Sequence, residues 1–269
     1  MSTIDPAAYP DLMAALTKIT ISAAEAIRSQ GQGGIHIKAD GSPVTAADEA
    51  AEAVIHDGLT QLSSALPIIS EEAAERNRPT AASGSYFLVD PLDGTKEFIA
   101  GRDEYTINIA LVADGVPVLG VIAAPAQGLI WRGILGRGAE RLKFSGREAE
   151  TPQAIKARPR PEGELIVMVS RSHLEARTQA YLDGFRHTRC VGCGSSVKFC
   201  RLAEGAADLY PRLAPTHDWD IAAGHAILVA AGGSVVDPDG GALRFGSPTL
   251  IIPAFVAWGG PAPTGVTRA

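Results

Sequence analysis

The sequence has little of several features that would assign it to a narrow class of protein. Among its 269 residues are three cysteines, and no apolar run reaches the roughly 18 residues that cross a bilayer as a helix. The N-terminal segment has neither the basic start nor the apolar run of a secretory signal. Positive charge is not in excess, because 24 basic and 30 acidic side chains give a net charge of −6. These absences predict a cytoplasmic protein with no transmembrane segment and no nucleic-acid partner.

The three cysteines, Cys190, Cys193 and Cys200, all lie in one segment. The C-x-x-C spacing of the first two is compatible with zinc or redox chemistry. However, no second pair follows, and Cys200 stands in an apolar stretch. Free cysteines of this kind are commonly small buried hydrophobic residues, so we expect neither a metal nor a redox role.

The first half of the chain predicts helices that alternate with strands. Apolar residues recur at helical spacing in residues 11–28 and again within 42–62, where Thr45 is a candidate N-cap with Asp48 three positions on. Short apolar runs at 67–70 and 86–90 predict buried strands. Residues 105–125 alternate in polarity and break at Asp114-Gly115, which indicates an antiparallel hairpin.

The second half predicts a different arrangement. A segment rich in proline and charge at 156–163 is the best candidate for a boundary. Beyond it, strands predicted at 164–170, 207–213 and 234–237 alternate with helical patterns, which favours parallel pairing. The hydrophobic content of 46% is ample for a core. We therefore predict an α/β protein, with a mostly antiparallel sheet in residues 1–156 and a mostly parallel sheet in residues 157–269.

Two aspartates surround a proline in the segment YFLVDPLDGTKEF, residues 86–98. Pro91 lacks an N–H to donate in a central strand, so the chain is expected to turn at Asp90, where Asp90 and Asp93 can converge. Gly94 permits a tight backbone, and a helix opening at Thr95 would offer free N–H groups to a phosphate. Converging carboxylates beside such a cradle suit Mg²⁺, and two such ions can activate a water.

Two other interpretations of this segment remain open. One phosphatase motif, DxDGT, uses its first aspartate as a covalent nucleophile, but here the spacing is one residue longer and that geometry does not transfer. Alternatively, DPLDG is only a polar turn, since Asp, Pro and Gly dominate turns.

Four motifs, in order along the chain, resemble those of the inositol monophosphatase superfamily of Mg²⁺-dependent, lithium-sensitive phosphatases. They are GSPVTAADEAAEAVI, PIISEEAAE, YFLVDPLDGTKEFI and THDWDIAAGHAILVAAGG. The shorter motifs SRSH, GSSVKFCRLAEG and LYPR are similar to those of its bacterial 3'(2'),5'-bisphosphate nucleotidases of sulfate assimilation. The resemblance implies a layered αβαβα sandwich and a hydrolase that binds two or more Mg²⁺ ions.

The resemblance also implies a set of metal ligands: Glu71, Asp90, the Leu92 carbonyl, Asp93 and Asp220. For Glu71, at the end of a predicted strand, the alternative is an ordinary surface acid. For Asp220, the alternative is a first-turn acid that interacts with the helix dipole. The adjacent Asp218 is interpreted as a capping or solvated residue.

A threonine and an acid have a catalytic role in the family, and they correspond here to Thr95 and Asp48. A threonine hydroxyl alone is a poor base, but a nearby carboxylate can take its proton and orient it toward a water. The alternative for Asp48 is a capping-box acid, and both roles can coexist.

Substrate contacts are implied in the second half of the chain. Ser195, Ser196 and Lys198 match the family's nucleotide-binding segment, and His173 and Arg212 match further contacts. For Lys198 the alternative is a solvated helix lysine. The reacting phosphate is expected to contact the metal site and its surroundings, namely Glu71, Leu92, Asp93, Gly94, Thr95 and Asp220.

Three functions are compared on this basis. The leading one is hydrolysis of the 3'-phosphate of adenosine 3',5'-bisphosphate, and of its 5'-phosphosulfate analogue, to release phosphate. The second is the same chemistry on inositol monophosphate or a sugar bisphosphate. The third is a non-catalytic nucleotide or metal sensor, which would lack a ligand residue, whereas every ligand position is filled here. We expect a monomer or homodimer, either free in the cytoplasm or peripheral on the cytoplasmic face of the inner membrane.

Overall fold

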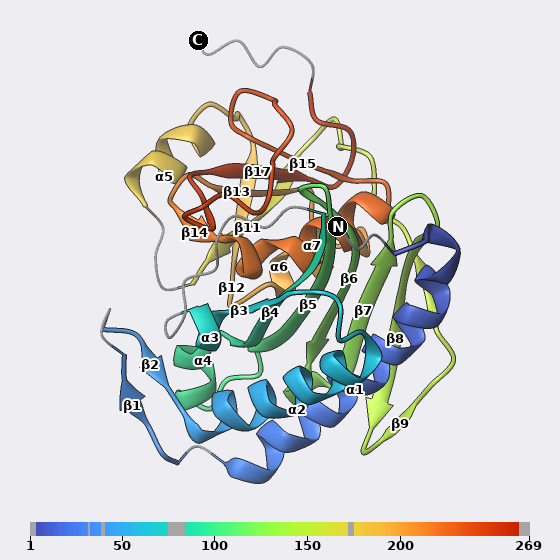
Figure 1. The fold of residues 1–269 in the computed structure, drawn as a ribbon. Helices are drawn as coiled ribbons and strands as arrows, with labels where there is room; N and C mark the ends of the chain where they lie inside the picture. Colours follow the sequence, from blue (N-terminus) through green and yellow to red (C-terminus); the bar gives the residue numbers. More distant parts are fainter. Residues whose placement is uncertain (1–3, 32, 39–40, 75–83, 172–174, 264–269) are drawn as a thin grey trace.

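The chain folds into alternating layers of helix and sheet, as seen from the bottom to the top of Figure 1. Two long helices cover the outer face of a large sheet, a central pair of helices covers its inner face, and a smaller sheet and a short helix follow. This is the expected αβαβα order. The computed structural model describes residues 4–31, 33–38, 41–74, 84–171 and 175–263.

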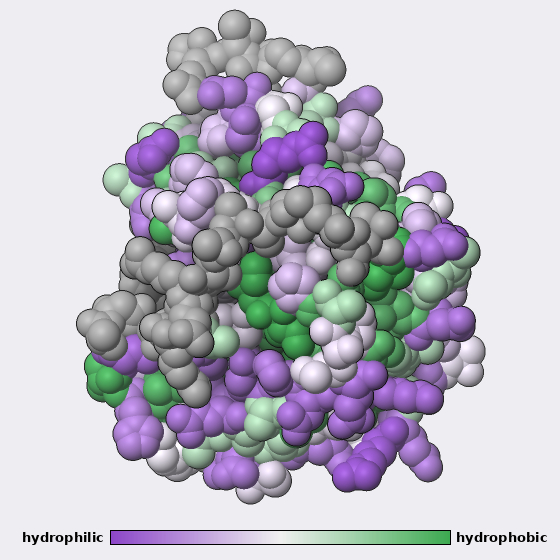
Figure 2. Space-filling model, viewed as in Figure 1, coloured by the Kyte–Doolittle hydropathy of each residue, from purple (hydrophilic) through white to green (hydrophobic). Residues whose placement is uncertain are grey.

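The two outer helices form where the apolar periodicity predicts them. Helix α1 buries Leu16 and Ile27 against the large sheet, and α2 buries Ile55 and Leu59 in the same cluster. Hydrophilic side chains cover their solvent face in the lower part of Figure 2, as expected of amphipathic helices. The elements here are η1 (Pro6–Ala8), α1 (Tyr9–Gln30), α2 (Ala46–Leu62) and a separate hairpin of β1 (His36–Ile37) and β2 (Pro43–Val44).

The large sheet has eight strands in the order β10-β8-β7-β6-β5-β4-β3, with β9 paired to β8. All its ladders are antiparallel except β3–β4, so the expectation of a mostly antiparallel first sheet is confirmed. Asp114 and Gly115 take positive φ angles of 49° and 77° at the predicted hairpin. The strands are β3 (Ile68–Ser70), β4 (Ser85–Asp93), β5 (Thr106–Ala113), β6 (Val116–Ala124), β7 (Leu129–Ile134), β8 (Gly138–Ser145), β9 (Glu148–Ala149) and β10 (Gln153–Ile155).

The sequence predicts that the chain turns at Asp90, and this prediction is wrong. Strand β4 instead continues to Asp93 through a bulge. Asp90 pairs with Asn108 and Asp93 pairs with Thr106, so three steps along β4 match two along β5. Beyond Val89, β4 has no ladder to β3 in the described residues, and a proline is tolerated on such an edge. In a regular strand, residues three apart face opposite sides, but the extra residue brings both aspartates to one side.

The second sheet is mixed rather than mostly parallel. Its order is β12-β11-β13-β17-β15; the two ladders of β11 are parallel and the two of β17 are antiparallel. Parallel pairing needs a crossover, which α5 and α6 supply, whereas β15 and β17 are joined without a helix. The elements are β11 (Leu165–Ser170), α5 (Ala176–Leu182), β12 (Thr188–Cys193), α6 (Val197–Ala203), β13 (Leu209–Arg212), α7 (Asp218–Ala230), β15 (Ser234–Val236) and β17 (Phe255–Trp258).

Helix α7 joins the two sheets into one core. It packs across β4, β5, β6 and β7 of the first sheet, and its residues share an apolar cluster with Phe199 of α6 and Phe255 of the second sheet. Gly120 allows this close approach, because a Cβ there would lie 2.4 Å from the Ala223 carbonyl oxygen. The division into sub-domains at residue 156 stays a prediction.

Candidate active site

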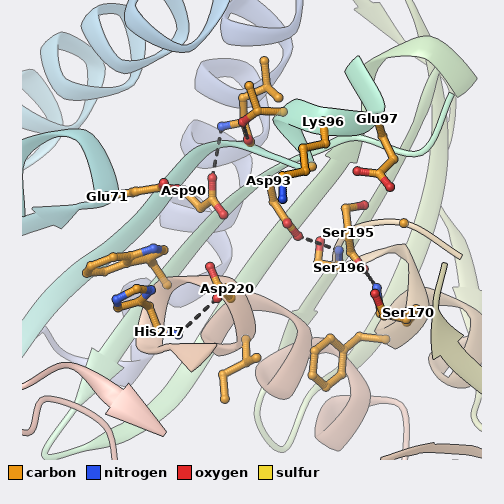
Figure 3. Close-up of a pocket in the computed structure, with 18 of the residues that line it drawn as sticks. Glu71, Asp90, Asp93, Lys96, Glu97, Ser170, Ser195, Ser196, His217 and Asp220 are labelled. Carbon is orange, nitrogen blue, oxygen red and sulfur yellow. Dashed lines mark hydrogen bonds between the residues drawn. The ribbon is translucent and has the colours of Figure 1, made fainter. Parts of the chain in front are cut away.

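A pocket of about 360 Å³ opens where the end of β4 meets the N-terminus of α7. Figure 3 shows carboxyl groups from both halves of the chain facing this space. The lining includes most of the residues that the sequence singles out: Glu71, Asp90, Leu92, Asp93, Gly94, Thr95, Ser195, Ser196, Lys198, Arg212 and Asp220. His173 lies outside the described residues.

Four carboxylates supply most of the negative charge of the pocket. Glu71 is the first residue of α3 (Glu71–Ala74), immediately after β3; Asp90 and Asp93 flank the bulge of β4; and Asp220 lies in the first turn of α7. Asp90 is almost wholly buried, with 1% of its surface exposed. Glu71 is therefore not an isolated surface acid but one side of this pocket.

Burial and mutual repulsion raise the pKa values of these acids. Burial, opposed by Lys38 and reinforced by Asp220, raises the pKa of Glu71 to about 7. Burial and the charge of Asp220 raise the pKa of Asp93 to about 6, and burial with neighbouring acids holds the pKa of Asp90 well above its usual range. Without a cation, the protein thus resists ionising this group of side chains fully.

Lysine 38 supplies a cation that sequence reasoning missed. Its ammonium lies 3.0 Å from Glu71 Oε1 and 2.8 Å from Glu72 Oε1, and these acids raise its pKa although burial acts in the opposite direction. Nothing in the sequence around Lys38 indicates this contact, which depends on how the β1–β2 hairpin packs.

The oxygen atoms that line the pocket are of the kind that bind a hard divalent ion. In the parts of the chain that the structure describes, no three acidic, histidine or cysteine side chains are gathered closely enough to hold an ion as they stand. Carboxylate and carbonyl oxygens at this density suit Mg²⁺, which typically keeps several waters and uses few protein ligands. The five-ligand set stays a prediction.

Asp48 lies beside Thr95, as the family resemblance implies. The Thr95 hydroxyl is 3.2 Å from Asp48 Oδ1 and also 3.2 Å from the Leu92 carbonyl oxygen. The other oxygen of Asp48 accepts the Thr45 backbone N–H at 2.8 Å, which completes a capping box on α2. Burial raises the pKa of Asp48, while bonds from Thr45 and Thr95 act in the opposite direction. One carboxylate therefore has the geometry for both expected roles.

Asp220 repeats this arrangement at the start of α7. Its Oδ2 accepts the His217 backbone N–H at 3.1 Å in a second capping box, and it also accepts from the Thr216 hydroxyl. Both acids stand where the positive end of a helix dipole stabilises a negative charge. Asp220 is therefore a capping residue of α7 and at the same time one of the residues that line the pocket.

Asp218 is neither solvated nor a cap, contrary to the expectation. It is fully buried, and its Oδ2 accepts the Gly246 backbone N–H at 2.6 Å. Burial raises its pKa to about 6. The start of α7 is packed against residues 245–250, where the Asp218 N–H also donates to the Leu250 carbonyl, so water is excluded.

A small polar network ties the second half of the chain to Asp93. The Ser196 backbone N–H donates to Asp93 Oδ2 at 2.6 Å. The Ser196 hydroxyl lies 2.6 Å from Asn108 Oδ1 and 2.7 Å from the Thr106 hydroxyl. Asn108 and Thr106 were not singled out from the sequence, because their place opposite the aspartates depends on the bulged pairing of β4 with β5.

Two cations, Lys198 and Arg212, also line the pocket. Lys198 is buried, with 4% of its surface exposed, so the interpretation as a solvated lysine is wrong. Its ammonium donates to the carbonyls of Cys193 and Ser195 at 3.2 and 2.5 Å. Arg212 ends β13, and Tyr210, Asp220 and Asp93 keep its pKa raised although burial opposes this.

The cysteines do not form a site. Cys193 and Cys200 are buried, as expected of small hydrophobic residues, whereas Cys190 is exposed on the edge strand β12. Burial raises the pKa of the Cys193 thiol to about 11, so it is not poised to react.

Among the described helices, none is long and apolar enough to cross a membrane.

Comparison with known proteins gives concordant matches. A profile described as the inositol monophosphatase family matches residues 9–262. The 3'(2'),5'-bisphosphate nucleotidase CysQ of Escherichia coli is 44% identical over 213 residues, which cover 77% of this chain and 81% of that protein. The protein of the same name from Haemophilus influenzae is 30% identical over 233 residues, covering 86% and 85% of the two chains.

Solved structures of proteins with these names have a similar fold. The crystal structure of CysQ from Bacteroides thetaiotaomicron superposes with a TM-score of 0.77 at 34% identity, covering 92% of this chain and 97% of that one. An inositol monophosphatase from Zymomonas mobilis gives a TM-score of 0.73 at 26% identity, covering 94% of each chain.

Proposed function

The chain belongs to the inositol monophosphatase family, and we propose that it is a Mg²⁺-dependent phosphatase that removes the 3'-phosphate of adenosine 3',5'-bisphosphate. The observation that carries the proposal is that both a group of carboxylates and two cations line one pocket. The carboxylates are Glu71, Asp90, Asp93 and Asp220, with Thr95 beside them, and the cations are Lys198 and Arg212. A bisphosphate nucleotide has two anionic groups, one for metal ions held by the carboxylates and one for the cations. The names of the CysQ relatives support the same substrate class.

The carboxylates of the pocket are proposed to hold the metal ions that bind the reacting phosphate. Glu71, Asp90, the Leu92 carbonyl, Asp93 and Asp220 would hold two or more Mg²⁺ ions. When bound, such ions neutralise charge on the phosphoryl oxygens and lower the pKa of a bound water. Gly94 also lines the pocket; its φ is 90°, and a Cβ there would lie 3.1 Å from the Glu104 carbonyl oxygen, so a larger residue would not fit.

Thr95 and Asp48 are proposed to orient the attacking water. Asp48 Oδ1 accepts the Thr95 hydroxyl hydrogen, which leaves a lone pair of Thr95 Oγ1 to accept a hydrogen from water. The water oxygen then forms the new P–O bond while the bond to the 3'-oxygen breaks. The 3'-oxygen leaves with the electron pair and takes up one proton while the attacking water gives up one, so the products are AMP and inorganic phosphate.

Lys198 and Arg212 are proposed to bind the second phosphate, at the 5' position. The Lys198 ammonium has three donors, and two of them bind carbonyls that fix its direction. The planar guanidinium of Arg212 is suited to a bidentate contact with phosphate. Ser195 and Ser196 line the pocket beside them.

The test is a phosphate-release assay on the purified protein with Mg²⁺. We expect kcat/KM for adenosine 3',5'-bisphosphate to exceed that for inositol 1-phosphate by at least ~10²-fold, or about 3 kcal/mol of transition-state binding. The 5'-phosphosulfate analogue should also react, and lithium should inhibit, as the family resemblance implies. Equal rates, or a preference for inositol phosphate or a sugar bisphosphate, would leave only the broader phosphatase assignment.

A further inference from the structure

We propose that Glu104 is a positioning residue that, together with Arg171, holds the loop of residues 192–196 against Asp93. Glu104 lies in the segment between α4 (Thr95–Ile99) and β5, and Arg171 directly follows β11. The kinetic consequence of this proposal rests on the proposed function, whereas its structural part does not.

The ion pair between the two side chains is a fork. Arg171 Nη2 lies 2.7 Å from both carboxylate oxygens of Glu104, and Arg171 Nε lies 3.1 Å from Oε2. Each partner also binds the backbone of the loop. The Gly194 N–H donates to Glu104 Oε2 at 2.9 Å, and Arg171 Nη2 donates to the Gly192 carbonyl at 3.1 Å. The pair therefore fixes one donor and one acceptor of the same short segment.

The same loop also contacts Asp93, one of the carboxylates that line the pocket. Ser195, directly after Gly194, takes a left-handed conformation with φ of 44°, which is unusual for a residue with a side chain. The next residue, Ser196, donates its N–H to Asp93 Oδ2 at 2.6 Å. Only one residue, Ser195, separates the amide that binds Glu104 from the amide that binds Asp93, so a shift at Gly194 is passed on to Asp93.

The backbone of Gly194 is packed tightly against Glu104 and Glu97. A Cβ at Gly194 would lie 2.7 Å from the Glu104 carbonyl oxygen and 2.9 Å from Glu97 Cγ. A Cβ at Gly94 would lie 3.1 Å from the same carbonyl oxygen and 3.3 Å from the Ser195 Cβ. The backbone of Glu104 is thus packed between Gly94 and the loop of residues 192–196.

Stability alone does not explain the pair. The side chains of Arg171 and Glu104 are 41% and 24% exposed, and exposed ion pairs contribute little to folding free energy. Burial acts to raise the pKa of Glu104, but bonds from Arg171 and Gly194 lower it overall, so the carboxylate stays ionised at neutral pH. A charged, forked contact on two backbone groups is suited to setting the geometry of a loop.

The variants Glu104→Gln and Arg171→Met test the proposal, and Arg147→Met is the matched control. Arg147 forms another exposed pair, with Glu25 at 3.4 Å, and it is absent from the pocket lining. Hydrogen exchange of the Gly194 and Ser196 amides is measured first. In both test variants these amides should exchange at least ~10-fold faster, while the melting temperature changes by less than about 2 °C. The control should leave both unchanged.

Kinetics with the best substrate of the phosphate-release panel give the second readout. KM should rise at least ~5-fold in both test variants with kcat changed less than about 2-fold, because the loop is loosened rather than the reacting groups removed. Unchanged exchange at Gly194 and Ser196, or faster exchange throughout the chain with a large loss of melting temperature, would overturn the proposal. Failure of the wild type to release phosphate would overturn the proposed function alone, since hydrogen exchange still reports on the loop.

Discussion

The Thr95 hydroxyl lies 3.2 Å from Asp48 Oδ1, although the two residues are 47 positions apart in the chain. The other carboxylate oxygen of Asp48 binds the backbone N–H and the hydroxyl of Thr45, at 2.8 and 2.6 Å. Capping and contact with Thr95 therefore use different oxygens of one side chain. This arrangement anchors the carboxylate on a long helix and directs its remaining oxygen to Thr95, which lines the pocket.

The variants Thr95→Ala and Asp48→Asn should each lower kcat more than they raise KM, because both residues act on the attacking water in the transition state. The double variant should be little worse than the more damaging single variant, as expected of groups that act as one unit. Asp48→Asn alone should also lower the melting temperature, because it weakens the helix cap. Steady-state kinetics and thermal unfolding measure these effects. Fully additive losses of kcat would show that Asp48 acts as a cap only.

Asp90→Asn should lower activity by at least ~10²-fold with the fold intact, since it removes a charge from the centre of the carboxylate group and keeps its shape. The metal-free variant should be at least as stable as the metal-free wild type, because Asp90 is buried among like charges. Turnover across a Mg²⁺ titration and circular dichroism are the measurements. Near-normal turnover at low Mg²⁺ would contradict the role of Asp90 as a ligand.

Lys198→Ala should erode the preference for adenosine 3',5'-bisphosphate while sparing activity on simple monophosphates, because the ammonium serves the second phosphate. The matched control is Lys143→Ala, an exposed lysine on β8. The ratio of kcat/KM values for the two substrates is measured in each variant. An unchanged ratio for Lys198→Ala would assign the lysine to its carbonyl contacts alone.

The metal-free protein should lose stability as pH rises through the range in which Glu71 ionises. The pKa of Glu71 is about 7 in the folded chain and about 4.3 in an unfolded one, so the folded state holds the extra proton in between. The free energy of unfolding therefore decreases with pH over this window. Relative to Glu71→Gln, the melting temperature of the chelator-treated wild type should fall by at least about 2 °C from pH 5 to pH 8.

Added Mg²⁺ should reverse this loss, and more strongly at pH 8 than at pH 5, because the ion competes with protons for the carboxylates. The Glu71→Gln reference cancels other titrating groups, including His225, whose pKa burial lowers to about 4. A difference between the two proteins that is constant with pH would contradict the raised pKa of Glu71.

Features governed by neighbours in sequence could be predicted well. The capping box of Thr45 and Asp48, the hairpin at Asp114-Gly115 and the helix opening at Thr95 each depend on a few adjacent residues. The segment around Pro91 was predicted less well, because a proline excludes a central strand but not an edge with a bulge. Which of these occurs depends on where β3 ends.

The sequence by itself determined the alternation of helices and strands, the order of the family motifs and the residue types that gather at the pocket. Only the tertiary structure decided that Lys38 contacts Glu71, that Asp218 is buried, that β17 pairs antiparallel and that Glu104 binds the Gly194 N–H. The physical reason is the distance along the sequence over which each interaction acts. Periodicity, capping and turn chemistry act over a few residues, whereas burial, ion pairing and strand register depend on groups far apart in sequence, which only the packed fold brings together.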